Sequence, residues 1–416
     1  MFIGIYILLC IITVIHFLRR KLDILTFAAF ALIFYTLSCI TGEVWITRAT
    51  GYYYYEQISF KTYLLVYCQL LIINICPHIS FRHFRLVSSV YVEDKISKNE
   101  IAAFNFICFI SMIIFVYNIL FVIGLDTFFS NTGKSEIIAN TNAFFSYSIW
   151  GIFISFSYGI QYKRKSMTIL SSIALVILLI LGSRSYPVIA LLILVLSRTS
   201  EIKKAVISYW KPIVLLCVVF VALLVYKEVY QYVRALDFAV VWERLKNWRT
   251  YVDIVNNGES RTTFALYNYV VDNNYRIPLL DSFVRIFSVI PFVNNIFSTT
   301  LPIRFSGIAK DTIFSSSYGL GSSFWGESYV MGGSLFLITI TVIWSFLIKH
   351  FRNKCILENK TFPFWATFMM YIAFYIHRLD WVQVWGSFKS VILWYFIFWF
   401  LKTILKRKYE YGSCNR

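Results

Sequence analysis

One arginine interrupts a long apolar segment of the sequence. The segment from Met167 to Leu196 consists of two apolar runs that meet at Gly182-Ser183-Arg184. A charged side chain within a membrane segment is costly, so its presence indicates a functional site by default. A guanidinium group binds phosphate through two parallel hydrogen bonds and stays charged at every physiological pH. The type and the place of Arg184 therefore favour the binding of a phosphate-bearing ligand.

Further arginines lie in residues 227–325, a long stretch without a clean membrane span. Together with Arg184 they suggest a site for the diphosphate of a lipid carrier. The alternative is that most of them form salt bridges with acidic residues of the same stretch. We favour this alternative for any single loop arginine, and function for Arg184, which has no acidic residue near it in the sequence. The arginines are Arg234, Arg244, Arg249, Arg261, Arg276, Arg285 and Arg304, and the acidic residues are Asp237, Glu243, Asp253, Glu259, Asp272, Asp281 and Asp311.

A glycine-rich segment, Ser316–Gly333, places Glu327 at the start of a predicted membrane helix. Its glycines allow close approach of the backbone. An acidic residue that enters a membrane span usually has a partner, so Glu327 is a candidate catalytic residue. The alternative is an ordinary helix N-terminus, where the helix dipole favours an acidic side chain.

The sequence His377-Arg378-Leu379-Asp380 lies between the last two predicted helices. His377 is a candidate general base for a hydroxyl group, oriented by Asp380, and Arg378 is a candidate catalytic cation beside it. The alternative is a capped, solvated turn. Glu43 and Arg48, near the first outer loop, are weaker candidates.

The sequence carries no pattern that is typical of a metal or cofactor site. The eight cysteines are scattered without metal-ligand spacing, and the first outer loop has no D-x-D or E-x-D pair. We therefore expect arginine, without a divalent ion or a cofactor, to neutralise the charge of the ligand.

Composition defines the class of protein. The chain has 416 residues, of which 59% are hydrophobic, and apolar runs recur along its whole length. This pattern predicts a single all-α membrane domain over residues 1–416. The net charge of +18 reports the orientation of the loops and does not indicate nucleic acid.

Apolar runs and basic clusters predict about eleven crossings, within a range of ten to twelve. Placing the basic clusters in the cytoplasm puts the N-terminus outside and the C-terminus inside. The predicted crossings are 1–18, 22–46, 62–79, 101–123, 143–161, the two runs of 167–196, 212–226, 326–348, 362–376 and 391–405.

The two runs around Arg184 allow two structures, one over-long helix or a hairpin with a recessed turn. Basic clusters flank the pair at Lys163-Arg164-Lys165 and at Arg198, Lys203 and Lys204. A single crossing would put these clusters on opposite sides of the membrane. The hairpin keeps both inside and points Arg184 outward, so we favour it.

Residues 227–325 form a predicted large outer loop that holds helices of its own. Apolar residues at helical spacing predict one amphipathic helix over Tyr230–Tyr251, lying at the membrane interface. The apolar stretch Phe283–Phe297 contains Pro291 and is too short to span, which favours an interfacial or re-entrant segment.

These features together resemble the O-antigen polymerase family of bacterial envelopes. The resemblance covers most of the chain and rests on the number of membrane helices, the Gly182-Ser183-Arg184 turn and the arginine-bearing outer loop. A further shared feature is the late G-E-x-Y segment, Gly326 to Tyr329, which is followed by Gly332-Gly333.

The resemblance implies a metal-independent glycosyltransferase of the GT-C type in the bacterial inner membrane, with its active site facing the periplasm. Such enzymes join oligosaccharide repeat units carried on undecaprenyl diphosphate and release undecaprenyl diphosphate, and a chain-length regulator is the implied partner. The catalytic candidates are then Arg184, Glu327, His377 and Arg378. The candidates for binding diphosphate or glycan are Arg234, Arg244, Arg249, Arg261, Arg285, Arg304 and Tyr329.

Three alternatives belong to other functional classes. A lipid-linked oligosaccharide flippase would show two similar halves and charges along several helices. An O-antigen ligase is expected to carry a histidine in its large loop, and residues 227–325 contain none. A structural membrane subunit has no positive feature in its favour. We therefore expect the polymerase.

Overall fold

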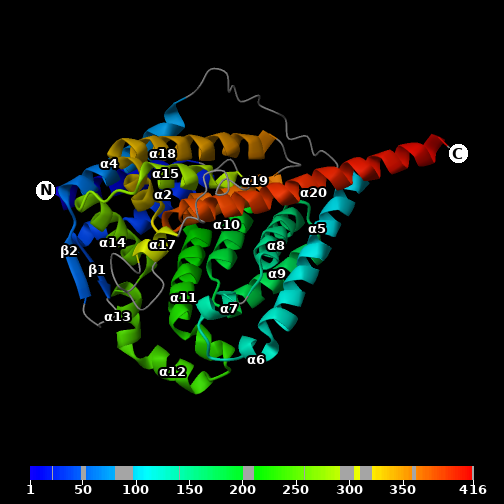
Figure 1. The fold of residues 1–416 in the computed structure, drawn as a ribbon, viewed down its shortest axis with the longest axis horizontal. Helices are drawn as coiled ribbons and strands as arrows, with labels where there is room; N and C mark the ends of the chain where they lie inside the picture. Colours follow the sequence, from blue (N-terminus) through cyan, green and yellow to red (C-terminus); the bar gives the residue numbers. More distant parts are fainter. Residues whose placement is uncertain are drawn as a thin grey trace.

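In a computed structural model, the residues that the structure describes are mainly helical, apart from one β-hairpin (Figure 1). The structure describes residues 1–20, 22–47, 53–79, 97–139, 141–199, 210–256, 258–290, 304–309, 321–357 and 362–414. Within these described residues, five helical segments are long and apolar enough to cross a membrane: Phe60–His78, Lys98–Ile123, Ala143–Gln161, Phe324–Phe351 and Trp381–Lys406. Shorter apolar helical segments are Phe2–Leu18, Ile24–Tyr35, Lys165–Ile180 and Ser185–Ser197. The prediction of a helical membrane protein is confirmed.

The N-terminal part contains a shorter second helix than predicted. A capping box starts this helix, since Asp23 Oδ1 accepts a hydrogen bond from Thr26 N at 2.8 Å. The predicted crossing 22–46 is wrong at its end, because the helix stops at Tyr35 and Gly42, at φ +78°, ends a further short turn. The elements are α1 (Phe2–Leu18), α2 (Ile24–Tyr35), α3 (Ser38–Thr41), β1 (Glu43–Thr47), β2 (Tyr53–Gln57), α4 (Phe60–Ile75) and η1 (Cys76–His78).

The two strands pair antiparallel, with Trp45 opposite Tyr55. Aromatic and β-branched residues favour strands, and both β1 and β2 are rich in them. Strand β1 lies mostly in the end of the predicted crossing 22–46, and β2 lies in the predicted outer loop that follows it. The hairpin packs against α14, which belongs to the large loop.

The core of the membrane part is a bundle of α5, α8, α9, α19 and α20. Aromatic rings fill it, with Phe104 stacked on Tyr158 at 4.0 Å between centroids. A Cβ atom at Gly151 would lie 1.9 Å from Ser111 Oγ, so glycine lets α5 and α8 approach closely. The elements in this region are α5 (Lys98–Tyr117), η2 (Asn118–Ile123), α6 (Leu125–Phe128), α7 (Lys134–Ala139), α8 (Ala143–Gln161) and α9 (Lys165–Ile180).

A hairpin joins α9 to α10 (Ser185–Thr199). Gly182 N donates to Leu179 O at 2.8 Å and Ser183 N donates to Leu178 O at 2.9 Å, the two bonds of a Schellman motif. Gly182 has φ +86°, which favours glycine, and a Cβ atom there would lie 2.5 Å from the Tyr230 ring. The predicted hairpin is confirmed, and Arg184 directly follows its turn.

The described part of the large loop begins with the end of α11, a helix of 25 residues, and continues as shorter helices. The prediction of a single amphipathic helix over residues 230–251 is wrong, because Leu236 at φ +58° and extended Asn247 divide it. The predicted segment Phe283–Phe297 is described only to Ile290, and its remainder lies outside the described residues. The elements are α11 (Trp210–Arg234), α12 (Phe238–Lys246), α13 (Trp248–Asn256), α14 (Glu259–Asp272), α15 (Leu279–Ile286), η4 (Phe287–Val289) and α17 (Phe305–Ile308).

The C-terminal part runs through α18 (Phe324–Leu357), α19 (Phe362–Tyr375), η7 (Ile376–Arg378) and α20 (Trp381–Cys414). A break at Gly332 and Gly333 divides α18, and Gly333 lies at φ +77°. The predicted loop between the crossings 362–376 and 391–405 is too long, because α20 begins at Trp381. Asp380 caps this helix, accepting a hydrogen bond from Gln383 N at 2.7 Å.

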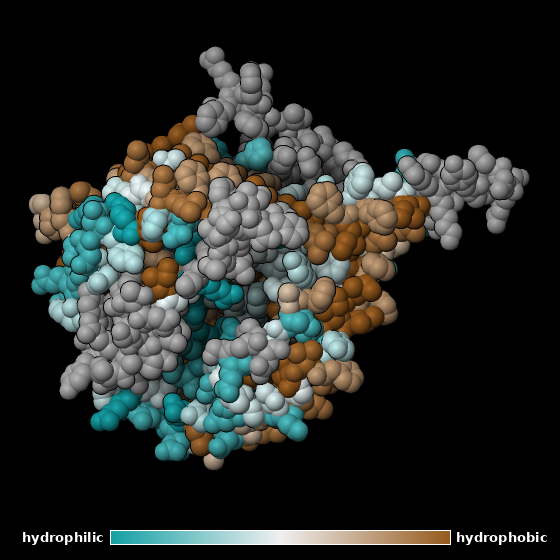
Figure 2. Space-filling model, in the orientation of Figure 1, coloured by the Kyte–Doolittle hydropathy of each residue, from teal (hydrophilic) through white to brown (hydrophobic). Residues whose placement is uncertain are grey.

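The surface has a hydrophobic part and a hydrophilic part. Figure 2 shows mostly hydrophobic side chains over α5 and α20, as expected for a face in contact with lipid. On the same view, a hydrophilic recess lies between the region of α13 and α14 and that of α11.

Candidate functional site

A cavity of about 590 Å³ lies between the α9–α10 hairpin and the helices of the large loop. Its walls come from α2, α3, the start of α7, the hairpin turn and the start of α10, α11, α13, α14, the end of α19 and η7. Glu259 is the one acidic residue among the described residues that line it. The five basic residues that line it are Lys134, Arg184, Lys227, Arg261 and Arg378. The cavity therefore has a strong positive balance.

Arg184 reaches into this cavity from the hairpin turn. Its Nη1 donates to the backbone oxygen of Leu223 on α11 at 3.3 Å, and its Nη2 forms a salt bridge with Glu259 Oε1. Gly182 allows this placement, because only a residue without a side chain fits beneath the Tyr230 ring. The turn, α11 and α14 thus fix one guanidinium group at the cavity wall.

Arg378 approaches the same carboxylate from η7. Its Nη1 forms a salt bridge with Glu259 Oε2, and its guanidinium lies 5.9 Å from the centroid of the Tyr375 ring. Gly321 packs against it, since a Cβ atom there would lie 3.1 Å from Arg378 Nε. A glycine of the segment Ser316–Gly333 therefore does allow a close approach, and the group that approaches is an arginine.

Glu259 occupies the first position of α14, where the helix dipole favours an acidic side chain. Burial raises the pKa of this carboxyl group, but the charges of Arg378 and Arg184 outweigh burial and hold the pKa at about 2. Glu259 is therefore ionised at neutral pH, and each of its oxygens binds a different arginine.

Three further cations complete the cavity. Arg261 lies over the Trp45 ring, with 3.9 Å from its central carbon to the ring centroid, so β1 positions it. Lys227 projects from α11, and Lys134 begins α7. Burial, together with the charge of Arg378, lowers the pKa of the Lys134 ammonium group to about 8. Lys134 therefore titrates close to neutral pH.

The remaining lining of the cavity is mainly apolar and aromatic. Tyr35 and Tyr375 add hydroxyl groups near the cations. The apolar residues include Phe34, Leu37, Val188, Phe220, Leu223, Leu224 and Phe374. A ligand that fits this lining combines an anionic group with an apolar part.

Glu327 and Arg285 form a second salt bridge, which is not part of the cavity lining. Glu327 Oε1 lies 2.5 Å from Arg285 Nη1, and Oε2 accepts a hydrogen bond from Trp381 N at 2.8 Å. The Glu327 side chain is 0% exposed and that of Arg285 is 3% exposed. This pair connects α15, α18 and α20 inside the protein.

Tyr329 lies in another polar cluster outside the cavity. Its hydroxyl group accepts a hydrogen bond from Lys61 Nζ at 2.5 Å and donates one to Asn274 Oδ1 at 2.8 Å. Arg276 Nη1 donates to the Tyr329 backbone oxygen at 2.6 Å. The cluster joins α4, α18 and the turn after α14.

His377 is 1% exposed and does not line the cavity, although its neighbour Arg378 does. Its Nδ1 accepts a hydrogen bond from Trp325 Nε1 at 2.8 Å, and its ring stacks on Tyr35 at 5.0 Å. Burial lowers its pKa to about 3, so the ring is neutral. Asp380 caps α20, and none of the described hydrogen bonds of His377 involves it.

The other candidate arginines of the loop also lie apart from the cavity lining. Arg234 is buried, and its Nη2 donates to the backbone oxygens of Ser130 and Thr132, which fixes the loop before Lys134. Arg244, Arg249 and Arg304 are exposed. Of the weaker candidates, Glu43 begins β1 and Arg48 lies outside the described residues.

Of the candidate residues, Arg184, Arg261 and Arg378 thus come together in the cavity. From the sequence, Glu259 was expected only as a neutralising partner within the loop, and Lys134 and Lys227 had no predicted role. Lys134 is the one basic residue of the outer segment 124–142, which is a usable signal. Glu259 and Lys227 carry no comparable signal, because only tertiary packing brings them to Arg184.

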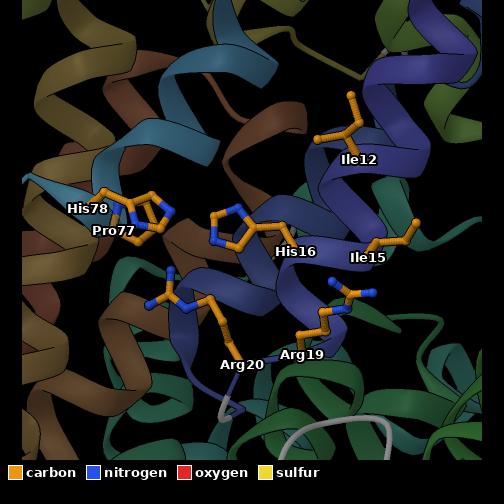
Figure 3. A pocket seen from close by; sticks show the side chains of 7 residues that line it. All are labelled: Ile12, Ile15, His16, Arg19, Arg20, Pro77 and His78. Carbon is orange, nitrogen blue, oxygen red and sulfur yellow. The ribbon is translucent and has the colours of Figure 1, made fainter.

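A second cavity, of about 620 Å³, lies at the C-terminal ends of α1 and α4 (Figure 3). The rings of His16 and His78 face each other there at 5.0 Å, close to Arg19 and Arg20. The N-terminal end of α4 contacts α14, through a hydrogen bond from Ser59 N to Asn268 Oδ1, so this second cavity lies at the opposite end of α4.

Among the described residues, no three His, Cys, Asp or Glu side chains are grouped as metal ligands. No family model, curated protein or solved structure matches this chain. The residues of the cavity therefore carry the functional proposal.

Proposed function

We propose that the protein is a glycosyltransferase that polymerises oligosaccharide repeat units carried on undecaprenyl diphosphate. One observation carries this proposal: Arg184 and Arg378 meet at a single carboxylate in a cavity with three further cations. Five cations against one acid in a partly apolar cavity fit the diphosphate of a lipid-linked substrate.

The cations have a role in the reaction as well as in binding. When the glycosidic bond to the diphosphate breaks, negative charge develops on the departing oxygen. Fixed guanidinium groups in a site of low dielectric stabilise this charge without reorganising. Arg184, which the hairpin turn and α11 hold in place, is suited to this task.

The apolar lining supports the lipid part of the proposed substrate. Phe34, Phe220 and Phe374 line the same cavity as the cations. A polyprenyl chain would leave the cavity along such surfaces towards the hydrocarbon of the bilayer, while the diphosphate stays with the arginines. A soluble sugar nucleotide has no polyprenyl chain that this apolar lining could bind.

The proposed topology has about eleven crossings, an outer N-terminus and an inner C-terminus. With that topology, the hairpin turn, α14 and η7 all face outward, and so does the start of α7. The site then lies at the periplasmic face of the inner membrane. There the acceptor sugar of a second lipid-linked repeat unit attacks the anomeric carbon of the first with inversion.

The test uses purified full-length protein in liposomes with a repeat unit on undecaprenyl diphosphate. Products of increasing length support the proposal. Translocation without elongation would instead indicate a flippase, and transfer to a lipid A acceptor a ligase. A matched pair of variants, Arg184→Lys and the exposed Arg249→Lys, separates a role of the cavity from general charge, since only the first should lose elongation.

A further inference from the structure

Among the described residues, arginine and glutamate form salt bridges in two places that differ in access. The pair Arg285–Glu327 is sealed, with side chains that are 3% and 0% exposed. In the cavity, the side chains of Arg184, Glu259 and Arg378 are 16%, 22% and 26% exposed. The second group is therefore open to a ligand, whereas the first is not.

Glu259 is placed where an anionic ligand would bind. Its two oxygens bind two guanidinium groups that come from separate segments, the hairpin turn and η7. Phosphate oxygens accept hydrogen bonds from guanidinium in the same geometry as carboxylate oxygens. A diphosphate offers more oxygens and more charge than one carboxylate, so it is able to compete for Arg184 and Arg378.

We propose that Glu259 occupies the diphosphate position of the empty site, and that the arriving diphosphate displaces it from Arg184 and Arg378. The displaced carboxylate then serves as the base for the acceptor hydroxyl group. This inference rests on the proposed function for the identity of the acceptor, whereas the displacement itself requires only an anion.

The proposed reaction exchanges one bond at the anomeric carbon of the donor for another. The acceptor oxygen forms a bond to the anomeric carbon of the donor, and the bond from that carbon to the diphosphate oxygen breaks. The diphosphate leaves with the electron pair and stays bound to the arginines. The hydroxyl proton moves to a carboxylate oxygen of Glu259.

Displacement makes Glu259 a better base. In the empty site Arg378 and Arg184 hold its pKa at about 2, so it takes up protons poorly. When diphosphate binds the arginines, their effect on the carboxylate is reduced, while its burial, which raises the pKa, persists. The base therefore becomes effective only with a donor in place.

Other candidates for the base have poorer access. His377 is 1% exposed and outside the lining, and Glu327 is sealed against Arg285. Within the described lining, Glu259 is the one carboxylate. The geometry therefore assigns both tasks to a single residue.

The experiment measures the binding of inorganic pyrophosphate and the elongation of repeat units with the same full-length protein. Glu259→Gln removes the competing charge, so we expect pyrophosphate to bind about tenfold more tightly. The same variant should elongate about 100-fold more slowly, because it lacks the base. Glu243→Gln, on exposed α12, is the matched control and should change neither quantity.

Glu259→Asp is the second variant. It keeps the negative charge, and it serves if Glu259→Gln folds poorly. With its shorter side chain at this position, the variant protein should also bind pyrophosphate more tightly than wild type and should keep partial activity. Unchanged or weaker binding of pyrophosphate by both folded variants would overturn the displacement. If displacement is seen but wild-type protein elongates nothing, the proposed function and the base fail while the anion site stands. If wild-type protein elongates repeat units but the variants bind pyrophosphate as wild type does, the displacement fails while the proposed function stands.

Discussion

Arg184 and Arg378 come from opposite halves of the chain, yet they bind the two oxygens of one carboxylate, that of Glu259. Neither arginine lies in the large loop, and the acid that joins them does. An element of the loop, α14, thus forms one wall of the cavity. This helix packs against the membrane helices α4 and α18. The loop is therefore part of the site, and separate variants can test each of its components.

The first prediction concerns the two arginines. Arg184→Lys and Arg378→Lys keep the charge but lose the paired hydrogen bonds of guanidinium. Removal of one fixed donor for developing charge lowers turnover by about 100-fold or more, and we expect an effect of that size in each variant. Elongation rates at saturating lipid-linked donor measure it. Arg249→Lys and Arg244→Lys, both at exposed positions, serve as controls and should retain the wild-type rate.

The second prediction concerns the turn that presents Arg184. Gly182→Ala places a side chain at φ +86° and 2.5 Å from the Tyr230 ring. The positive φ alone costs about 1–2 kcal/mol for a residue with a side chain. We expect a lower unfolding temperature in detergent and a loss of pyrophosphate binding, because the turn must move.

Two variants sharpen this test. Gly386→Ala is the control, since a Cβ atom at Gly386 on α20 meets nothing within 4 Å, and it should leave stability and binding intact. Gly182→Ala combined with Tyr230→Ala relieves the clash but not the backbone strain, so it should recover stability only in part. Wild-type behaviour of Gly182→Ala itself would contradict the role of the turn.

The sequence was informative where the signal is local. The basic clusters on either side of residues 167–196 predicted the hairpin, and Gly182 fits its turn, because a helix end of this kind needs a glycine at positive φ. The start of α20 also had a local signal, Asp380 followed three residues later by Gln383, which forms a capping box. The longer loop predicted there followed hydropathy and overlooked this cap.

Which residues meet in the cavity could not be predicted from the sequence. Glu259 meets Arg184 only because α14 packs against membrane helices, and no spacing in the sequence encodes that contact. The break at Leu236 was equally hidden, since a leucine rarely adopts φ +58°, yet here it ends α11 where a glycine would be expected. Arg285 and Glu327 could both be nominated by type, but only the structure shows that they bind each other.

The third prediction assigns the pair Arg285–Glu327 to stability. Removal of one partner of a buried ion pair costs about 3–5 kcal/mol, because the other charge stays buried and unpaired. We therefore expect Glu327→Gln to reduce the yield of folded protein strongly. The folded fraction should bind pyrophosphate as wild type does, since Glu327 does not line the cavity.

A double variant tests this assignment. Arg285→Met with Glu327→Gln removes both charges and keeps an acceptor for Trp381 N, which now donates to Glu327 Oε2. Its unfolding temperature should exceed that of Glu327→Gln alone. A fully stable Glu327→Gln that has lost elongation would show instead that Glu327 acts in catalysis.

The fourth prediction uses the titration of Lys134, whose pKa burial and the charge of Arg378 lower to about 8. Below that pH the ammonium group adds to the positive charge of the cavity, and above it the neutral amine does not. Pyrophosphate affinity should therefore decline as pH rises through about 8 in wild type. Lys134→Arg keeps its charge throughout this range and should bind with a flatter pH dependence. The titration of pyrophosphate itself is common to both proteins, so identical pH profiles would show that Lys134 does not contribute to the anion site.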